Sequence, residues 1–141
     1  MLKYRKSRQV DALDIIIDGM KVTAQTPNMR SVLYYIIEYI DTVKFIPRYL
    51  NLKPEIDKTI SNIIVQSFAD LFRNVVTIDA EPARIIDEVA RITNSVMIPK
   101  LREQIAINAV ISETRITEAC QTFIPAALLK LRTSLHADLS G

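Results

Sequence analysis

Few side chains in this sequence could act as nucleophiles or shuttle protons. The one histidine, His136, lies close to the end of the chain, and the one cysteine, Cys120, has Ile116 and Phe123 at helical distance. A histidine in the last turn of a helix is typically a solvated group that suits the helix dipole. A cysteine among apolar neighbours is typically a small buried residue rather than a nucleophile. With no second histidine to act as a base, we expect no catalytic triad or dyad.

Paired carboxylates could do acid–base chemistry or hold a divalent cation. Asp14 and Asp18 are four residues apart and Glu38 and Asp41 are three apart, so each pair would share one face of a helix. A solvated helix face gives the same pattern, and Lys21 follows Asp18 at the right distance to neutralise it. We therefore interpret both pairs as surface charges. They are the only candidates for mutation should the chain be an enzyme of unrecognised type.

The rest of the composition argues against several other classes of function. No spacing resembles a set of metal ligands, and two glycines are too few for a phosphate-binding loop, so a P-loop nucleotide hydrolase is excluded. The formal net charge of +2 gives no overall attraction to nucleic acids or membranes. We expect a non-enzymatic protein with no cofactor and no metal.

Length and cysteine content indicate one domain held together by apolar burial. The chain has 141 residues, of which 49% are hydrophobic, and its single cysteine cannot form an internal disulfide. This fits the cytoplasm or another reducing intracellular compartment. The basic start resembles a signal peptide, but Asp11, Asp14 and Asp18 interrupt its apolar stretch, and no run approaches the roughly 18 to 20 apolar residues of a membrane span. We therefore expect a soluble protein, or part of a soluble assembly, with no transmembrane segment.

Prolines and apolar spacing together predict helices. Proline is tolerated in the first turn of a helix and is costly inside one, so each of the six prolines predicts a helix start or a break. Apolar residues at steps of three and four then predict helices over 9–24, 28–44, 54–76, 82–96, 99–123 with a break near 112, and 125–137. Alternation typical of a strand appears only briefly, at 74–79. The sequence predicts an all-α fold: a bundle of five to six helices punctuated by prolines, or an irregular array of helical hairpins, forming a single domain over 9–141.

A short motif recurs in the chain. Phe45, Met97 and Phe123 each precede an Ile-Pro pair, at separations of 52 and 26 residues. A period of 26 lies within the range of helical repeat units, but the intervening residues match poorly. We favour the interpretation that an apolar residue before a helix-starting proline packs against the first turn, as a hydrophobic staple does.

Tyrosines and leucines supply the candidate partner interface. Four tyrosines fall within sixteen residues. Three of them, Tyr34, Tyr35 and Tyr39, widen the apolar coverage of the predicted helix 28–44 until it must be central to the bundle or face a partner. Tyrosine is enriched at interfaces because it combines a large apolar area with a polar tip. The last predicted helix carries a row of leucines. The candidate interface residues are Tyr34, Tyr35, Tyr39, Tyr49, Leu128, Leu131 and Leu135.

The first eight residues form a basic arm with no acidic side chain. Its candidate contacts to nucleic acid are Lys3, Tyr4, Arg5, Lys6 and Arg8. The four cations could neutralise phosphates and the tyrosine could stack on a base, although such a start is more commonly a solvated tail. We prefer the hypothesis of a non-catalytic structural or adaptor subunit that acts through protein contacts, with self-association, in a larger assembly. The alternative is a nucleic-acid-binding accessory protein anchored by the arm.

Overall fold

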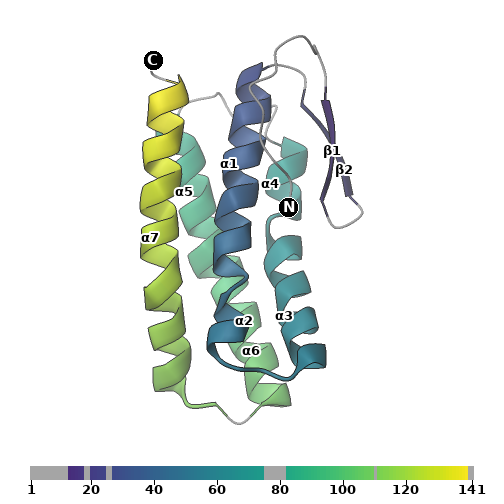
Figure 1. The fold of residues 1–141 in the computed structure, drawn as a ribbon, viewed down its shortest axis with the longest axis vertical. Helices are drawn as coiled ribbons and strands as arrows, with labels where there is room; N and C mark the ends of the chain where they lie inside the picture. The colour runs from purple at the N-terminus through teal and green to yellow at the C-terminus, as the bar shows by residue number, and fades with distance from the viewer. Residues whose placement is uncertain (1–12, 18–19, 25–26, 75–81, 110, 140–141) are drawn as a thin grey trace.

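The computed structural model describes residues 13–17, 20–24, 27–74, 82–109 and 111–139. In these ranges the helices join end to end into four rods, which pack side by side as a bundle (Figure 1). The first rod joins α1 (Pro27–Val43) to the short α2 (Ile46–Tyr49), and the second joins α3 (Pro54–Ser67) to α4 (Ala69–Asn74). The third runs through α5 (Pro82–Ile92), the π-helical turn η1 (Thr93–Met97) and α6 (Ile98–Asn108), and the fourth is α7 (Glu113–Leu139).

The rods alternate in direction along the chain, so that consecutive rods run antiparallel (Figure 1). Helix α7 packs against α1 and α5, and α3 packs against α6. The all-α class is therefore confirmed. The predicted number of five to six helices is corrected to four rods. The breaks expected at Pro99 and Pro125 do not interrupt the helical path.

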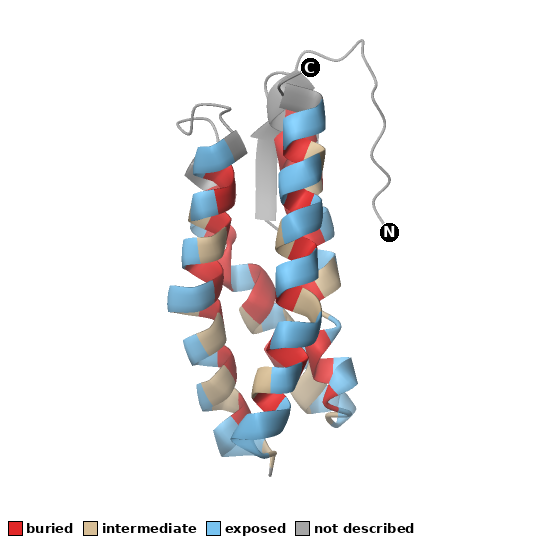
Figure 2. Ribbon diagram, turned by 90° about the vertical axis from the view of Figure 1, so that its left-hand side faces the viewer, coloured by how far each residue is buried: buried red, intermediate tan, exposed pale blue. Residues whose placement is uncertain are grey.

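Apolar stripes at helical spacing face one another inside the bundle, and the opposite faces of the helices are exposed (Figure 2). Burying one such aliphatic or aromatic side chain contributes roughly 1.5 to 3 kcal/mol, so this shared core accounts for the fold without a disulfide or metal. The largest fully buried side chains are Phe68, Phe72, Leu33, Ile36, Ile46, Leu50, Ile60, Ile64, Ile85, Met97, Leu101 and Ile105.

The helix predicted over 9–24 is wrong. Residues Leu13–Ile17 form strand β1 and Met20–Ala24 form β2, an antiparallel pair in which Ile15 lies opposite Val22. β-branched side chains favour strands because they are stiff at χ1. Asp-Gly, the dipeptide at 18–19 that separates the strands, is among the strongest sequence signals for a two-residue hairpin. One correctly placed glycine thus outweighs the general scarcity of glycine in the chain.

Three prolines begin helices as predicted: Pro27, Pro54 and Pro82 are the first residues of α1, α3 and α5. Pro99 instead lies within the third rod. Its ring would clash with the carbonyl four residues earlier in a regular helix. The π turn that precedes it shifts the bonding pattern, since the N–H of Ile98 donates to the carbonyl of Thr93, five residues back.

Pro125 lies inside α7 and does not begin a helix. Buried residues occur on both sides of it, including Cys120, Ile124 and Ala127, so packing against the bundle holds the two halves of α7 in line. The staple interpretation is therefore wrong for Phe123, which is in the middle of a helix. The predicted break near Ser112 is confirmed, because α6 ends at Asn108 and α7 begins at Glu113.

Two sequence predictions fall largely outside the described residues. The short strand considered at 74–79 has only its first residue described, and Asn74 ends α4. The basic arm, with Lys3, Tyr4, Arg5, Lys6 and Arg8, is not described at all. Among the described helices, none combines the length and the apolar character that crossing a bilayer requires.

Candidate functional site

The groups with reactive side chains are scattered over the bundle. Cys120 is buried in α7, and burial raises the pKa of its thiol, although Arg102 opposes that shift. His136 is exposed at the other end of the same helix. Glu38 and Asp41 are both exposed on α1, as a solvated face predicts. Within the described residues, no group of three or more histidine, cysteine or acidic side chains is placed to hold a metal ion.

A hydrogen-bonded polar pair lies in the core between α1 and the π turn. The Tyr39 hydroxyl and Thr93 Oγ1 are 2.7 Å apart, and Thr93 Oγ1 donates to the Val89 carbonyl at 2.8 Å. Since that bond uses the only hydroxyl hydrogen of Thr93, the Tyr39 hydroxyl is the donor to Thr93. Both side chains are therefore satisfied although nearly all of their surface is buried.

The surroundings of Tyr39 hold its phenol in the neutral form. Burial raises the pKa of Tyr39 from 10.0 to about 12, and the hydrogen bond with Thr93 only partly offsets that effect. Its ring meets Phe68 edge-on, with centroids 5.9 Å apart and an interplanar angle of 75°. Such a tyrosine is a packing residue with a satisfied polar tip, because a phenol this difficult to ionise is a poor acid or base near neutral pH.

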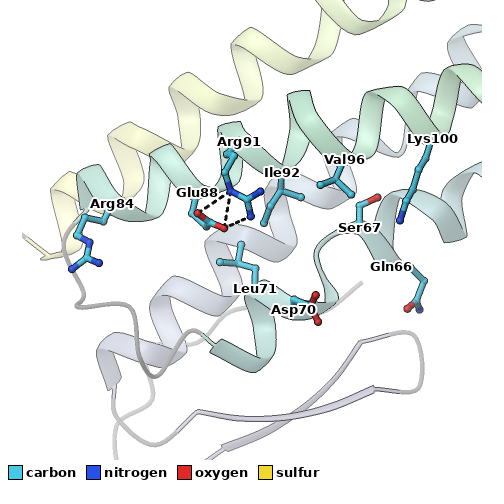
Figure 3. A pocket seen from close by; sticks show the side chains of 10 residues that line it. All are labelled: Gln66, Ser67, Asp70, Leu71, Arg84, Glu88, Arg91, Ile92, Val96 and Lys100. Atoms are coloured by element: carbon cyan, nitrogen blue, oxygen red, sulfur yellow. Dashed lines mark hydrogen bonds and ion pairs between the residues drawn. The ribbon is translucent and has the colours of Figure 1, made fainter.

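A cavity of about 480 Å³ lies between the second and third rods (Figure 3). Its floor is apolar and its rim is charged. The lining residues are Gln66, Ser67, Asp70, Leu71, Arg84, Glu88, Arg91, Ile92, Val96 and Lys100.

Glu88 and Arg91 form an ion pair at the rim of this cavity, with Arg91 Nη2 2.5 Å from Glu88 Oε1. The hydrogen bond from Arg91 lowers the pKa of the Glu88 carboxyl, so this group stays ionised at neutral pH. Ser67 is not activated as a nucleophile, because its hydroxyl donates to the Ile63 carbonyl at 2.8 Å. The Lys100 side chain extends from α6 toward the α3 side of the cavity (Figure 3). The cavity thus offers fixed charges over an apolar floor rather than a nucleophile paired with a base.

An exposed group of aromatic side chains lies where α1 gives way to α2. The Phe45 and Phe123 rings stack with centroids 6.5 Å apart, and Tyr49 meets Phe123 edge-on at 5.6 Å. The Arg48 guanidinium lies over the Phe45 ring at 5.5 Å from its centroid. Phe45 is 49% exposed and Tyr49 is 45% exposed. We call these four residues, Phe45, Arg48, Tyr49 and Phe123, the aromatic patch.

Local sequence explains why the patch is held outward. The buried pair Ile46 and Pro47, together with buried Leu50, anchors the single turn of α2 in the core. The side chains that flank this anchor, Phe45 and Tyr49, are left on the opposite side. Two copies of the recurring Phe-Ile-Pro motif therefore meet in space, one from the α1–α2 connection and one from α7. Sequence reasoning noticed the recurrence but did not identify Phe45 or Phe123 as surface residues that meet.

Most of the predicted interface residues belong to the core. Tyr34, Tyr39, Leu131 and Leu135 are buried within the chain, so they cannot offer a surface to a partner. Helix α1 packs against α7, and the buried side chains of the two helices include Tyr39 on α1 and Leu131 and Leu135 on α7. Tyr35 and Leu128 are partly exposed, and Tyr49 is exposed.

Comparison of the chain with protein-family models gives no match, and comparisons with curated proteins and with solved structures give none either.

Proposed function

We propose that this chain is a non-catalytic helical subunit, structural or adaptor in role, that acts through protein contacts and associates with itself through the aromatic patch. The observation that carries the proposal is the exposure of about half of Phe45 and Tyr49 beside Phe123 and Arg48. A reducing intracellular compartment remains our expectation for its location.

The chemistry of the patch is that of interface anchors. Aromatic residues and arginine are enriched at the centres of protein interfaces, where a few of them supply most of the binding free energy. Here the rings already hold one another through stacked and edge-on contacts, and Arg48 already covers Phe45. A partner would therefore restrict few additional rotamers on docking, which lowers the entropic cost of association.

The distribution of reactive groups supports a non-catalytic role. In the cavity between the second and third rods, the Glu88 carboxylate is ionised and paired with Arg91, and the Ser67 hydroxyl is hydrogen-bonded to a backbone carbonyl. Elsewhere, burial raises the pKa of the Cys120 thiol. A thiol that stays protonated is a weak nucleophile. The aromatic patch contains no histidine, cysteine, serine or carboxylate, the groups that most often serve as nucleophiles or general bases.

Sedimentation of the full chain tests the proposal. We expect the wild-type chain to associate as its concentration rises through the micromolar range, and the double variant Phe45→Ser/Tyr49→Ser to remain monomeric. Leu129→Ser is the matched control, because Leu129 is a large apolar residue of α7 that is 63% exposed and is not one of the four patch residues. Circular dichroism confirms that each variant is folded. A wild-type chain that is a monodisperse monomer throughout, or association that survives the double substitution, would overturn the proposal.

A further inference from the structure

A second surface lies at the end of the bundle where the α2–α3 connection, the end of α6 and the start of α7 meet (Figure 1). These segments enclose an open groove of about 540 Å³. We call it the end groove. None of the aromatic-patch residues lines it.

The walls of the end groove are aliphatic and incompletely covered. Ile107, near the end of α6, is 67% exposed, the largest fraction among the described large apolar side chains. Leu52 and Ile111 face the same groove and are only partly buried. Several solvent-exposed aliphatic residues clustered in one groove are typical of a binding surface, whereas a single exposed leucine or isoleucine needs no explanation.

The rim of the groove is positive. Lys53 and Arg115 line it, and neither side chain makes a hydrogen bond or ion pair with any described residue. No acidic residue is among the described residues that line the groove. Arg102 provides the contrast at the same end of the bundle, because it is paired with Glu113 and also bonds to Thr117.

Both cationic side chains lie at helix N-termini. Lys53 is the N-cap of α3, and Arg115 lies in the first turn of α7. A helix N-terminus carries roughly half a positive charge, but the first turns of α3 and α7 also carry Glu55, Asp57 and Glu113. The positive charge of the rim therefore comes from the Lys53 and Arg115 side chains themselves. The C-terminus of α6 opposes them, but the Asn108 side-chain amide already donates to the Gln104 carbonyl there at 2.9 Å.

The groove is preformed by its backbone. Asn51 has a left-handed φ of 57°, a conformation that asparagine tolerates better than most residues. Its N–H donates to the Arg48 carbonyl at 2.9 Å, and the N–H of Leu52 donates to the Pro47 carbonyl at 3.2 Å. On the opposite wall, the Ser112 hydroxyl accepts a hydrogen bond from the N–H of Arg115 at 3.3 Å. Both walls are thus fixed by local bonds, which reduces the ordering cost of binding.

We propose that the end groove binds a peptide segment of a partner protein that combines aliphatic side chains with adjacent carboxylates. The aliphatic side chains would cover Leu52, Ile107 and Ile111, and the carboxylates would pair with Lys53 and Arg115. Charge complementarity selects an anionic ligand. The exposed aliphatic wall selects a peptide over a nucleic acid, whose phosphates gain nothing from isoleucine. This inference rests on the proposed function, since it names the kind of partner that a protein-contact subunit would recognise.

Fluorescence anisotropy with the full chain tests the groove. The probe is a fluorescein-labelled peptide with Leu-Glu-Glu-Leu at its centre and glycine and serine on both sides. The comparison peptides carry Leu-Lys-Lys-Leu, which reverses the charge, and Gly-Glu-Glu-Gly, which removes the aliphatic side chains. We expect the first peptide to bind about tenfold or more tightly than either comparison peptide, because each lacks one of the two matched features.

Variants of the chain locate the binding. Lys53→Glu/Arg115→Glu should weaken binding of the acidic peptide about tenfold or more and improve binding of the lysine peptide, and Ile107→Ser should weaken binding of both leucine peptides. Arg132→Glu is the matched control, because Arg132 is an exposed arginine of α7 that does not line the groove. Equal affinity for the three peptides, stronger binding of a single-stranded oligonucleotide of equal charge, or an acidic-peptide affinity unchanged in the double variant would overturn the inference.

The two proposals can fail separately. The groove variants leave Phe45, Arg48, Tyr49 and Phe123 unchanged, so their sedimentation reports on the aromatic patch alone. Loss of peptide binding with intact self-association would support the groove and the proposed function together. Absence of self-association in a chain that still binds the acidic peptide would overturn the patch and leave the groove standing.

Discussion

Two pairs of aromatic rings in this molecule have nearly the same geometry and opposite surroundings. Tyr39 and Phe68 meet edge-on at 5.9 Å inside the bundle, and Tyr49 and Phe123 meet edge-on at 5.6 Å on its surface. The inner pair is almost completely removed from water and its hydroxyl is hydrogen-bonded, whereas Tyr49 keeps 45% of its surface exposed. Ring geometry alone therefore does not say what an aromatic pair contributes.

The two pairs differ in the step that gains the free energy of burying apolar area, which is folding for one pair and association for the other. Removing apolar area from water contributes roughly 25 cal/mol per Å², and the inner pair gains that contribution when the chain folds. The exposed half of the surface pair gains it only when another molecule covers the patch. We therefore expect changes in the core to alter stability, and changes in the patch to alter association with little effect on stability.

The largest expected effect separates the two regions directly. Phe68 is fully buried and its truncation leaves a cavity, so Phe68→Ala should lower the free energy of unfolding by about 3 to 5 kcal/mol. Phe45→Ala removes a ring that is half exposed, and we expect a loss of less than about 1 kcal/mol. Urea unfolding followed by circular dichroism at a concentration where the chain is monomeric measures both. Similar losses for the two variants would contradict the comparison.

The core of the bundle could largely be predicted from the sequence, whereas the patch could not. The run from Ile60 through Ile64 and Phe68 repeats at steps of four, so its burial follows from helical geometry. Phe45 and Phe123 are far apart in the chain, and no local pattern indicates that they meet. Their contact depends on the bend after α1 and on the continuity of α7 through Pro125, and tertiary packing decides both.

The end groove could not be predicted from local sequence patterns either. Lys53 and Arg115 come from the starts of two different helices, and only the return of α7 beside the α2–α3 connection brings them to one rim. Over residues 9–24 the local pattern was misleading, because the apolar spacing there suited a helix. The Asp-Gly pair at 18–19 is a strong local signal for a hairpin, and it outweighs both that spacing and the low overall glycine content.

Alkaline pH provides the second test, because it acts on the buried phenol of Tyr39. The pKa of Tyr39 rises from 10.0 in the unfolded chain to about 12 in the folded one. The folded state therefore holds this proton more tightly, and the resulting stability is complete below pH 10 and is lost as pH rises toward 12. A shift of about two pH units corresponds to roughly 2 to 3 kcal/mol.

The matched variant for this test is Tyr39→Phe. We expect the free energy of unfolding of the wild-type chain to fall more steeply than that of Tyr39→Phe between pH 10 and 12, since both chains share every other titrating group. Parallel curves for the wild type and Tyr39→Phe would show that the buried phenol does not resist ionisation.

The smallest of the three effects concerns Thr93, whose hydroxyl accepts the hydrogen bond from the Tyr39 hydroxyl. Thr93→Val keeps the shape of the side chain but leaves the buried Tyr39 hydroxyl without an acceptor, which should cost about 1 to 3 kcal/mol. Thr93→Ser keeps the acceptor and should cost only the roughly 0.8 kcal/mol of a lost methyl group.

A double-mutant cycle then separates the hydrogen bond from packing. In Tyr39→Phe/Thr93→Val, the unsatisfied hydroxyl is gone together with its acceptor, so the combined loss should be smaller than the sum of the two single losses. Additive losses would mean that the two hydroxyls do not interact in the folded chain. The interior pair would then owe its stability to ring packing alone, and hydrogen bonding would no longer distinguish it from Tyr49 and Phe123 at the surface.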